Sequence, residues 1–266
     1  MSFNGLSSVN VELTSRCNKS CAMCGRRKHE RDDPNVLNTY GDMSFSMVEY
    51  IASQLPDGIT TQLHSNGEPT LYPRLGDAIH LFSRQGCLVS FDTNGKLLVE
   101  KASEIIDNVD TIAISVIQND PEKDEQLRVI KEFLHIKGNR KPLVVIRLNG
   151  EQDETPYKNL GVTIAKRVLH HPMGSYEYSR DVTVPETGVC MDLLHRLSID
   201  RFGNVSLCVR YDPNGDGIIG NVLTEKLDEI WNGKVRAEII RNHLCGNRGF
   251  WKICSTCDFW GLPTGW

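Results

Sequence analysis

The chain has 266 residues, which is long enough for one barrel-sized domain or for two smaller ones with an ample core. Its formal net charge of -4 and its isoelectric point near 6.1 provide no broad positive surface for a phosphate backbone, so we expect no nucleic-acid partner. The sequence shows no charged-then-apolar signal segment and no apolar stretch of bilayer length. We therefore expect a cytoplasmic protein with no membrane partner.

Apolar, strand-like runs alternate with helical patterns over the first two thirds of the chain. This order predicts βα units around a parallel sheet. The expected strands cover residues 9–13, 60–64, 88–91, 111–116 and 143–148, with a weaker sixth strand over 162–169. The expected helices cover residues 47–55, 75–83, 97–106 and 124–136.

After about Met173 the alternation stops and cysteines return, which indicates a second module. A glycine turn between two short apolar runs predicts a β-hairpin, and an Asn-Gly stop separates two short helical patterns. The expected elements are a hairpin of residues 197–200 and 205–208 and helices over 224–231 and 235–243. Because no long linker is present, we expect modules over residues 1–173 and 174–266 that pack together.

A CxxxCxxC triplet, Cys17, Cys21 and Cys24, follows the first expected strand. Three thiolates in one short loop can hold three irons of a cubic four-iron, four-sulfur cluster and leave the fourth iron open to a substrate or cofactor. Structural zinc is the alternative, but it requires four ligands, and a CxxxC start is less usual for it. The nine cysteines of the chain also favour metal ligation in a reducing compartment over a disulfide framework.

Polar segments follow the next two expected strands. Asn66-Gly67-Glu68-Pro69 comes after the second strand, and Thr93-Asn94-Gly95 comes after the third. Sites in α/β proteins gather at the carboxyl ends of parallel strands, so these segments are expected near the cysteine loop. Taken alone, each segment could also be an ordinary turn.

Together, these segments resemble the radical S-adenosylmethionine (SAM) enzymes. The resemblance implies an α/β fold, a partial (β/α)6 TIM-like barrel with a small C-terminal α+β auxiliary-cluster module. It also implies that the open iron chelates the amino and carboxylate groups of SAM, and that one electron cleaves SAM to methionine and a 5'-deoxyadenosyl radical. Met23 stands where the family commonly has an aromatic residue, and its soft apolar side chain can still cover the cofactor.

The same resemblance implies a set of SAM contacts. The glycine permits close backbone approach, and an anionic Glu suits the cationic ammonium of SAM. The segment after the third strand and single residues in the fourth and fifth strands resemble positions that contact the SAM ribose and carboxylate. The positions implied to contact SAM are Asn66, Gly67, Glu68, Pro69, Asn94, Ser115 and Arg147.

The C-terminal module resembles the auxiliary-cluster domain called twitch, a reduced form of the SPASM domain. The implied ligands of a second four-iron cluster are Cys190, Cys208, Cys254 and Cys257. A four-cysteine zinc site is the alternative for this set. The segment from Gly220 to Gly233 also resembles the sequence that the family has between these cysteines.

Two cysteines and a histidine pair remain. Cys87 is expected to be a small buried hydrophobe. Cys245 could be inert, a ligand or a hydrogen-atom donor, since reactivity depends on its setting. His170 and His171 are adjacent on an expected strand and would point to opposite faces, so they are poorly placed to chelate one metal.

The resemblance implies an oxidoreductase that removes a substrate hydrogen atom and passes the second electron to the auxiliary cluster. In size and cysteine spacing the chain resembles the twitch-bearing 2-deoxy-scyllo-inosamine dehydrogenase class, which implies a small polar substrate such as a sugar or aminocyclitol. A flavodoxin- or ferredoxin-type protein is the implied electron donor. The alternatives are an epimerase with Cys245 as hydrogen donor, a peptide-modifying enzyme, for which the few residues before Val9 leave no leader-binding domain, and a non-enzymatic metal scaffold.

Overall fold

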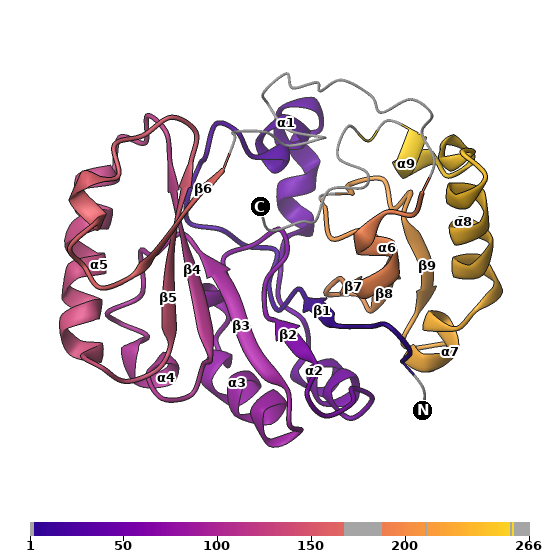
Figure 1. Cartoon of the computed structure of the whole chain (residues 1–266), viewed down its shortest axis with the longest axis horizontal. Helices are drawn as coiled ribbons and strands as arrows, with labels where there is room; N and C mark the ends of the chain where they lie inside the picture. The colour runs from indigo at the N-terminus through magenta and orange to yellow at the C-terminus, as the bar shows by residue number, and fades with distance from the viewer. Residues whose placement is uncertain (1–2, 168–187, 211, 256, 258–266) are drawn as a thin grey trace.

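The computed structural model describes residues 3–167, 188–210, 212–255 and 257. Its described strands form one nine-stranded sheet in the order β6-β5-β4-β3-β2-β1-β7-β8-β9 (Figure 1). Neighbours from β6 to β7 run parallel, and β7, β8 and β9 pair antiparallel. The strands are β1 (Ser8–Val11), β2 (Thr60–Gln62), β3 (Leu88–Thr93), β4 (Thr111–Ile117), β5 (Leu143–Asn149), β6 (Thr163–Arg167), β7 (Arg196–Ile199), β8 (Asn204–Ser206) and β9 (Ile218–Asn221).

Helices cover one face of the parallel part of this sheet. Four of them, α2 to α5, lie along the outer face, and α1 stands beyond the ends of the strands (Figure 1). The helices are α1 (Gly25–Asp32), α2 (Phe45–Ala52), α3 (Leu75–Arg84), α4 (Ala102–Ile105), α5 (Lys123–Lys137), α6 (Met191–His195), α7 (Leu227–Trp231), α8 (Lys234–Leu244) and α9 (Lys252–Ser255). The expected partial (β/α)6 barrel with a small C-terminal module is confirmed.

None of the helices that the structure describes is both long and apolar enough to span a bilayer.

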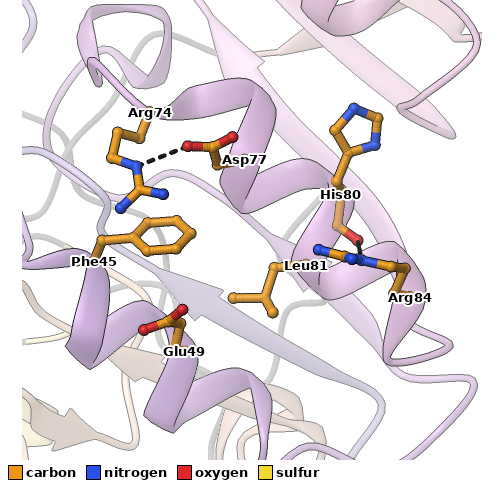
Figure 2. Close-up of a pocket in the computed structure, with 7 residues that line it drawn as sticks. All are labelled: Phe45, Glu49, Arg74, Asp77, His80, Leu81 and Arg84. Atoms are coloured by element: carbon orange, nitrogen blue, oxygen red, sulfur yellow. Dashed lines mark hydrogen bonds and ion pairs between the residues drawn. The ribbon is translucent and has the colours of Figure 1, made fainter.

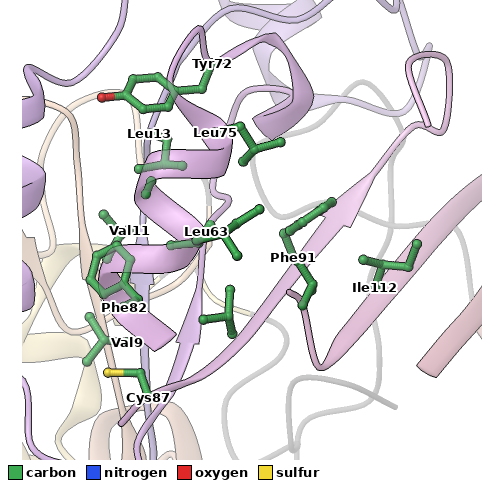
Figure 3. Packing of buried hydrophobic residues seen from close by; sticks show 14 of the residues in the cluster. Val9, Val11, Leu13, Leu63, Tyr72, Leu75, Phe82, Cys87, Phe91 and Ile112 are labelled. Atoms are coloured by element: carbon green, nitrogen blue, oxygen red, sulfur yellow. The ribbon is translucent and has the colours of Figure 1, made fainter. Parts of the chain in front are cut away.

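Alternation along β3 and β5 explains how much of the barrel sheet builds its core, whereas β4 is buried on both faces around Ala113. Successive side chains of a strand point to opposite faces, and one set on each strand is apolar and buried against the helices. Phe82 of α3 packs among Val9 and Val11 of β1, and Leu63 lies between this group and Phe91 of β3 (Figure 3). Cys87 is 5% exposed and belongs to this core, as expected.

Several local elements differ from expectation. The helix expected over residues 97–106 is shorter, because hydrogen-bonded turns after Gly95 bury Leu98 and the α-helix begins only at Ala102. Helix α1 was not expected, since its sequence GRRKHERD lacks apolar periodicity. Strand β9 was also not expected, since IIGN is short and contains a glycine.

The C-terminal hairpin is confirmed, but its place in the sheet was not anticipated. Strands β7 and β8 pair antiparallel, and Gly203 adopts a φ of +83 at the turn, a conformation that favours glycine. Strand β7 also pairs in parallel with β1, with Ser8 opposite Arg196, so the sheet continues into the C-terminal part. The expected boundary between residues 173 and 174, and the pair His170 and His171, lie outside the described residues.

Candidate functional site

The cysteine loop follows β1 and leads into α1. The amide of Cys24 donates to the carbonyl of Cys21 at 3.1 Å, and Cys24 is the N-cap residue of α1. All three thiols are partly buried and interact electrostatically with one another. Burial raises the pKa of Cys21 to about 11, and the Lys19 ammonium opposes that rise. A cationic cluster would reverse the effect of burial, because metal ligation deprotonates a thiol outright.

A buried ion pair anchors this loop to the end of β4. Lys19 lies between the first two cysteines, and its Nζ pairs with the Asp120 carboxylate. The two side chains are 4% and 5% exposed. The Nζ of Lys96 also donates to the carbonyl of Asn18 at 3.1 Å. These cations hold the cysteine loop against the loops that follow β3 and β4.

The glycine-rich segment after β2 packs directly on the cysteine loop. The carbonyl of Asn66 accepts a hydrogen bond from Arg26 of α1 at 3.0 Å. A Cβ atom on Gly67 would lie 2.0 Å from the carbonyl oxygen of Thr14 and 2.8 Å from that of Arg16. Only glycine fits this close approach of two backbone segments. In this chain Gly67 therefore serves the packing of two loops, in addition to any contact with a cofactor.

Glu68 is the centre of a buried hydrogen-bond network. Its carboxylate is 2% exposed and accepts from the amide and hydroxyl of Thr70 at 3.1 and 2.6 Å. It also accepts from the Thr93 hydroxyl and from the Asn94 amide, each at 2.7 Å. Burial raises the pKa of Glu68, and these four hydrogen bonds oppose that rise. The carboxylate thus joins the loops after β2 and β3, and its expected contact with the SAM ammonium stays a prediction.

Asn94 lies beside the first cysteine. Its Nδ2 donates to Asn18 Oδ1 at 2.7 Å and lies 4.0 Å from the sulfur of Cys17. Its carbonyl accepts from Gln126 Nε2 at 2.7 Å, and the same Nε2 donates to the carbonyl of Ser115 at 2.9 Å. The structure therefore brings Asn94 and Ser115 together through Gln126, which sequence reasoning missed. The sequence signal that could have found Gln126 is its spacing, because it lies three residues before Val129 on the buried face of α5.

Arg147 is engaged with groups on the inner face of the sheet. Its guanidinium pairs with the Asp92 carboxylate of β3. His64, which follows β2, accepts from the Asp92 amide through Nδ1 at 3.0 Å and lies 3.7 Å from the carboxylate through Nε2. Burial opposes ionisation of Asp92, yet the charges of His64 and Arg147 keep its pKa below the usual value. The expected contact of Arg147 with SAM stays a prediction.

The second set of cysteines comes together from distant parts of the chain. Cys190 begins α6, Cys208 follows β8, and Cys254 lies in α9. The pKa of Cys254 is raised to about 12, mainly by burial and also by the Cys190 and Cys257 thiols. Cys257 also acts on the buried thiol of Cys208, so all four predicted ligands interact. In the part of the chain that the structure describes, no three His, Cys, Asp or Glu side chains converge as the ligands of one metal ion would.

Cys245 is the C-cap residue of α8 and is exposed. A surface pocket of about 460 Å³ between α2 and α3 is lined by none of the predicted site residues (Figure 2). There Arg74 donates to Asp77 at 2.7 Å and stacks on the Phe45 ring. The residues that line the pocket are Phe45, Glu49, Arg74, Asp77, His80, Leu81 and Arg84.

Residues 11–142 match the Radical SAM superfamily, and residues 190–258 match the SPASM iron-sulfur cluster-binding domain. The chain belongs to the radical SAM superfamily. It is a radical SAM enzyme whose N-terminal domain implies SAM and a four-iron cluster and whose SPASM domain implies further iron-sulfur binding. Which residues of this chain hold those groups stays a prediction.

Two curated proteins are similar to part of this radical SAM chain. A stretch of 94 residues, 34% of the chain, is 31% identical to the tungsten-containing aldehyde ferredoxin oxidoreductase cofactor-modifying protein of Pyrococcus furiosus. A stretch of 89 residues is 28% identical to neomycin C epimerase of Streptomyces fradiae. The matched stretches span 24% and 27% of the lengths of these two relatives.

Among solved structures, the chain is similar to BtrN, a 2-deoxy-scyllo-inosamine dehydrogenase, in complex with AdoMet and 2-DOIA. The TM-score is 0.57 at 16% identity, over 95% of this chain and 93% of BtrN. At this identity the similarity shows a shared fold.

Titration of Glu12 is expected to make the stability of the protein fall as pH rises. Glu12 follows β1 and is 5% exposed, and its pKa is raised to about 7, mainly by burial and then by Asp200. A carboxyl group with a raised folded-state pKa contributes most stability below its unfolded pKa and loses that contribution as pH rises through the folded pKa. Between pH 4.5 and 7, wild type should therefore lose about 3 kcal/mol of unfolding free energy relative to Glu12→Gln.

Denaturant unfolding of both proteins across this pH range measures the difference, and Glu49→Gln, at an exposed carboxyl of α2, is the control. Parallel stability curves for wild type and Glu12→Gln would show that Glu12 ionises normally.

Proposed function

We propose that this radical SAM enzyme is an oxidoreductase that removes two electrons from a carbon of a small polar molecule such as a sugar. When bound, SAM and the N-terminal cluster supply a hydrogen-abstracting radical, and the auxiliary cluster takes up the second electron. The observation that supports the proposal is that the thiols of Cys190, Cys208, Cys254 and Cys257, from distant parts of the chain, act on one another electrostatically. Four thiolates close the coordination of an auxiliary cluster, which leaves it suited to electron transfer.

The residues of the N-terminal site have distinct tasks in this proposal. Cys17, Cys21 and Cys24 would hold the open cluster, and the Lys19–Asp120 pair fixes the loop that carries them. Asn94 donates toward the sulfur of Cys17, and hydrogen bonds to cluster sulfurs tune the potential of the cluster.

The auxiliary site is electrostatically linked to the inner face of the sheet. Cys208 follows β8, two strands away from β1. The charge of Arg210 acts both on Cys208 and on Arg167 at the end of β6. An auxiliary cluster at Cys208 would therefore lie near enough to the inner face to influence a substrate bound there.

The setting of the thiols supports a reducing compartment and an external electron donor. All nine cysteines are free thiols in the structure. We infer a cytoplasmic location, because cytosolic reductants keep thiols in this state. A flavodoxin- or ferredoxin-type protein would supply the electron for SAM cleavage.

Epimerisation is the second candidate, favoured by the similarity of one stretch to neomycin C epimerase. An epimerase needs a hydrogen-atom donor next to the substrate carbon. Cys245, the donor proposed for this reaction, is exposed at the end of α8. This position supports the oxidoreductase over the epimerase. Product formed in deuterated buffer separates them, since epimerisation places solvent deuterium at the inverted carbon.

Loss of the auxiliary ligands is expected to separate SAM cleavage from product oxidation. The double variant Cys254→Ala/Cys257→Ala should lose about half of the roughly eight irons expected for two clusters. It should still form 5'-deoxyadenosine but no oxidised product. Iron analysis and product chromatography on the anaerobically reconstituted protein measure these outcomes.

Cys245→Ala is the matched control and should leave both clusters and turnover intact. The double variant must elute as a folded protein, because metal binding and folding are coupled. If Cys245→Ala instead abolishes formation of a stereoisomer while SAM cleavage persists, the epimerase is the correct assignment.

A further inference from the structure

Arg26 is a buried arginine directly after the cysteine loop. It lies two residues after Cys24, in the first turn of α1, and its side chain is 3% exposed. Arginine is almost never buried this fully without close partners. The thiols of Cys17 and Cys24 both act electrostatically on its guanidinium. The N-terminal site therefore has a buried positive charge beside two of its three predicted cluster ligands.

The contacts of Arg26 join three segments around the site. A terminal nitrogen of the guanidinium donates to the Asn66 carbonyl at 3.0 Å, in the loop after β2 that is predicted to bind SAM. The guanidinium carbon also lies 4.2 Å from the centre of the Tyr40 ring, in the connection between α1 and α2. Arg26 thus holds the start of α1, the loop after β2 and this connection together.

The charge of Arg26 is only partly balanced by neighbouring carboxylates. Glu30 Oε1, one turn along α1, lies 3.6 Å from the guanidinium. The other oxygen of Glu30 forms a shorter ion pair with Arg27, so one carboxylate is shared by two arginines. The Arg26 charge also acts on Glu12, but the pKa of that buried carboxyl is raised to about 7, so it carries only part of a negative charge near neutral pH.

One donor of Arg26 is unused. Its Nε is buried and has no hydrogen-bond partner among the residues that the structure describes. Native proteins satisfy nearly all buried N–H groups with protein, water or a ligand. The sulfur atoms of an iron-sulfur cluster accept such hydrogen bonds, and both these bonds and the local charge set its reduction potential.

We propose that Arg26 raises the reduction potential of the N-terminal cluster and positions the loop after β2 for SAM. A buried positive charge stabilises the reduced cluster, which carries one electron more, and solvent screens such a charge only weakly. A higher potential makes the cluster easier for an electron donor to reduce. The inference takes Cys17, Cys21 and Cys24 as the ligands, and it holds for an oxidoreductase and for an epimerase alike.

Reductive titration of the reconstituted enzyme, followed by EPR spectroscopy, tests the inference. The signal that changes when SAM is added belongs to the N-terminal cluster, because only the open iron binds SAM, and the auxiliary cluster is an internal reference. In Arg26→Gln, the ratio of reduced to oxidised N-terminal cluster should fall about tenfold at a given potential, a shift of about 59 mV for one electron. SAM affinity should fall about tenfold, since a charged hydrogen bond to the Asn66 carbonyl is lost.

Lys28→Gln is the matched control, because it removes the same charge from the same helix. Lys28 is 48% exposed and pairs with Asp32, so the potential and SAM affinity should stay those of wild type. Arg26→Lys keeps the charge and should restore most of the potential. It should recover SAM affinity only in part, because an ammonium lacks the planar fork of a guanidinium. Glu30→Gln removes an acid that offsets Arg26 and should raise the potential.

An N-terminal potential in Arg26→Gln equal to that of Lys28→Gln would overturn the role of the charge, and unchanged SAM affinity would overturn the role at Asn66. If Arg26→Gln holds no iron, Glu30→Gln decides, because a potential that stays or falls contradicts the inference. The proposed oxidoreductase function is read separately, from oxidised product. An enzyme that only inverts a stereocentre, yet shows the expected shifts in potential, would refute the oxidoreductase and leave the role of Arg26 standing.

Discussion

Replacing Asp120 with Ala is expected to lower the free energy of unfolding by about 3 to 5 kcal/mol. The Lys19–Asp120 pair is almost fully buried, so removal of the carboxylate leaves an ammonium without its counterion in the interior. The loop between Cys17 and Cys21 would then move to hydrate Lys19, and the variant should retain less iron at the N-terminal site. Denaturant unfolding and iron analysis under anaerobic conditions measure both effects.

Asp32→Ala is the matched control for this experiment. Asp32 pairs with Lys28 on α1, where its side chain is 58% exposed, so its loss should leave stability close to that of wild type. The double variant Lys19→Met/Asp120→Leu should recover much of the lost stability, because an apolar pair removes both desolvation costs. Stability of Asp120→Ala within about 1 kcal/mol of wild type would show that water already reaches the pair.

Replacing Glu68 with Ala is expected to lower the free energy of unfolding about as much as replacing Asp120 does, for a different reason. Four groups that donate to the carboxylate, the amide and hydroxyl of Thr70, the hydroxyl of Thr93 and the amide of Asn94, would become buried donors without an acceptor. Each unsatisfied donor costs about 1 to 3 kcal/mol, so a combined loss of about 3 to 5 kcal/mol is expected after partial relaxation. SAM cleavage should fall as well, because Asn94 would no longer be held beside Cys17.

Two comparisons separate this structural role from direct SAM binding. Thr93→Val removes one donor together with its hydrogen bond and should cost about 1 kcal/mol. Glu68→Gln keeps the side-chain volume but turns an amide N–H₂ toward other donors. Its free energy of unfolding should therefore lie between those of wild type and Glu68→Ala. If Glu68→Ala unfolds at the wild-type denaturant concentration and loses only SAM affinity, the carboxylate is a cofactor ligand. Its hydrogen bonds to Thr70, Thr93 and Asn94 would then contribute little to stability.

The local pattern of the sequence was sufficient for most of the barrel. Alternation of apolar and polar residues fixed the five main strands, because it reflects which face meets the helices. The same alternation located the segments that surround the cysteine loop, since they follow strand ends. It could not find α1, whose charged residues stabilise one another through ion pairs such as Arg27 with Glu30 and carry no apolar stripe.

Contacts between distant residues have no such local signal. Lys19 lies in a polar loop and resembles a solvated charge, and only the fold shows Asp120, about a hundred residues away, as its partner. Gln126 is similar, because its two acceptors are backbone carbonyls in other elements. That the second cysteine set forms one cluster site stays a prediction from resemblance to a family, since cysteine spacing alone does not determine which loops meet.

The pairing of β7 with β1 has a consequence for how the chain is made. Strand β1 leaves the ribosome well before its partner Arg196–Ile199, so one of its edges has no partner until then. During this interval a central strand presents unpaired amides and carbonyls to other chains. Pairing across so long a separation is slow to form, so nascent chains are exposed to misassembly until β7 emerges. Chaperone binding near β1 would protect the chain during this interval.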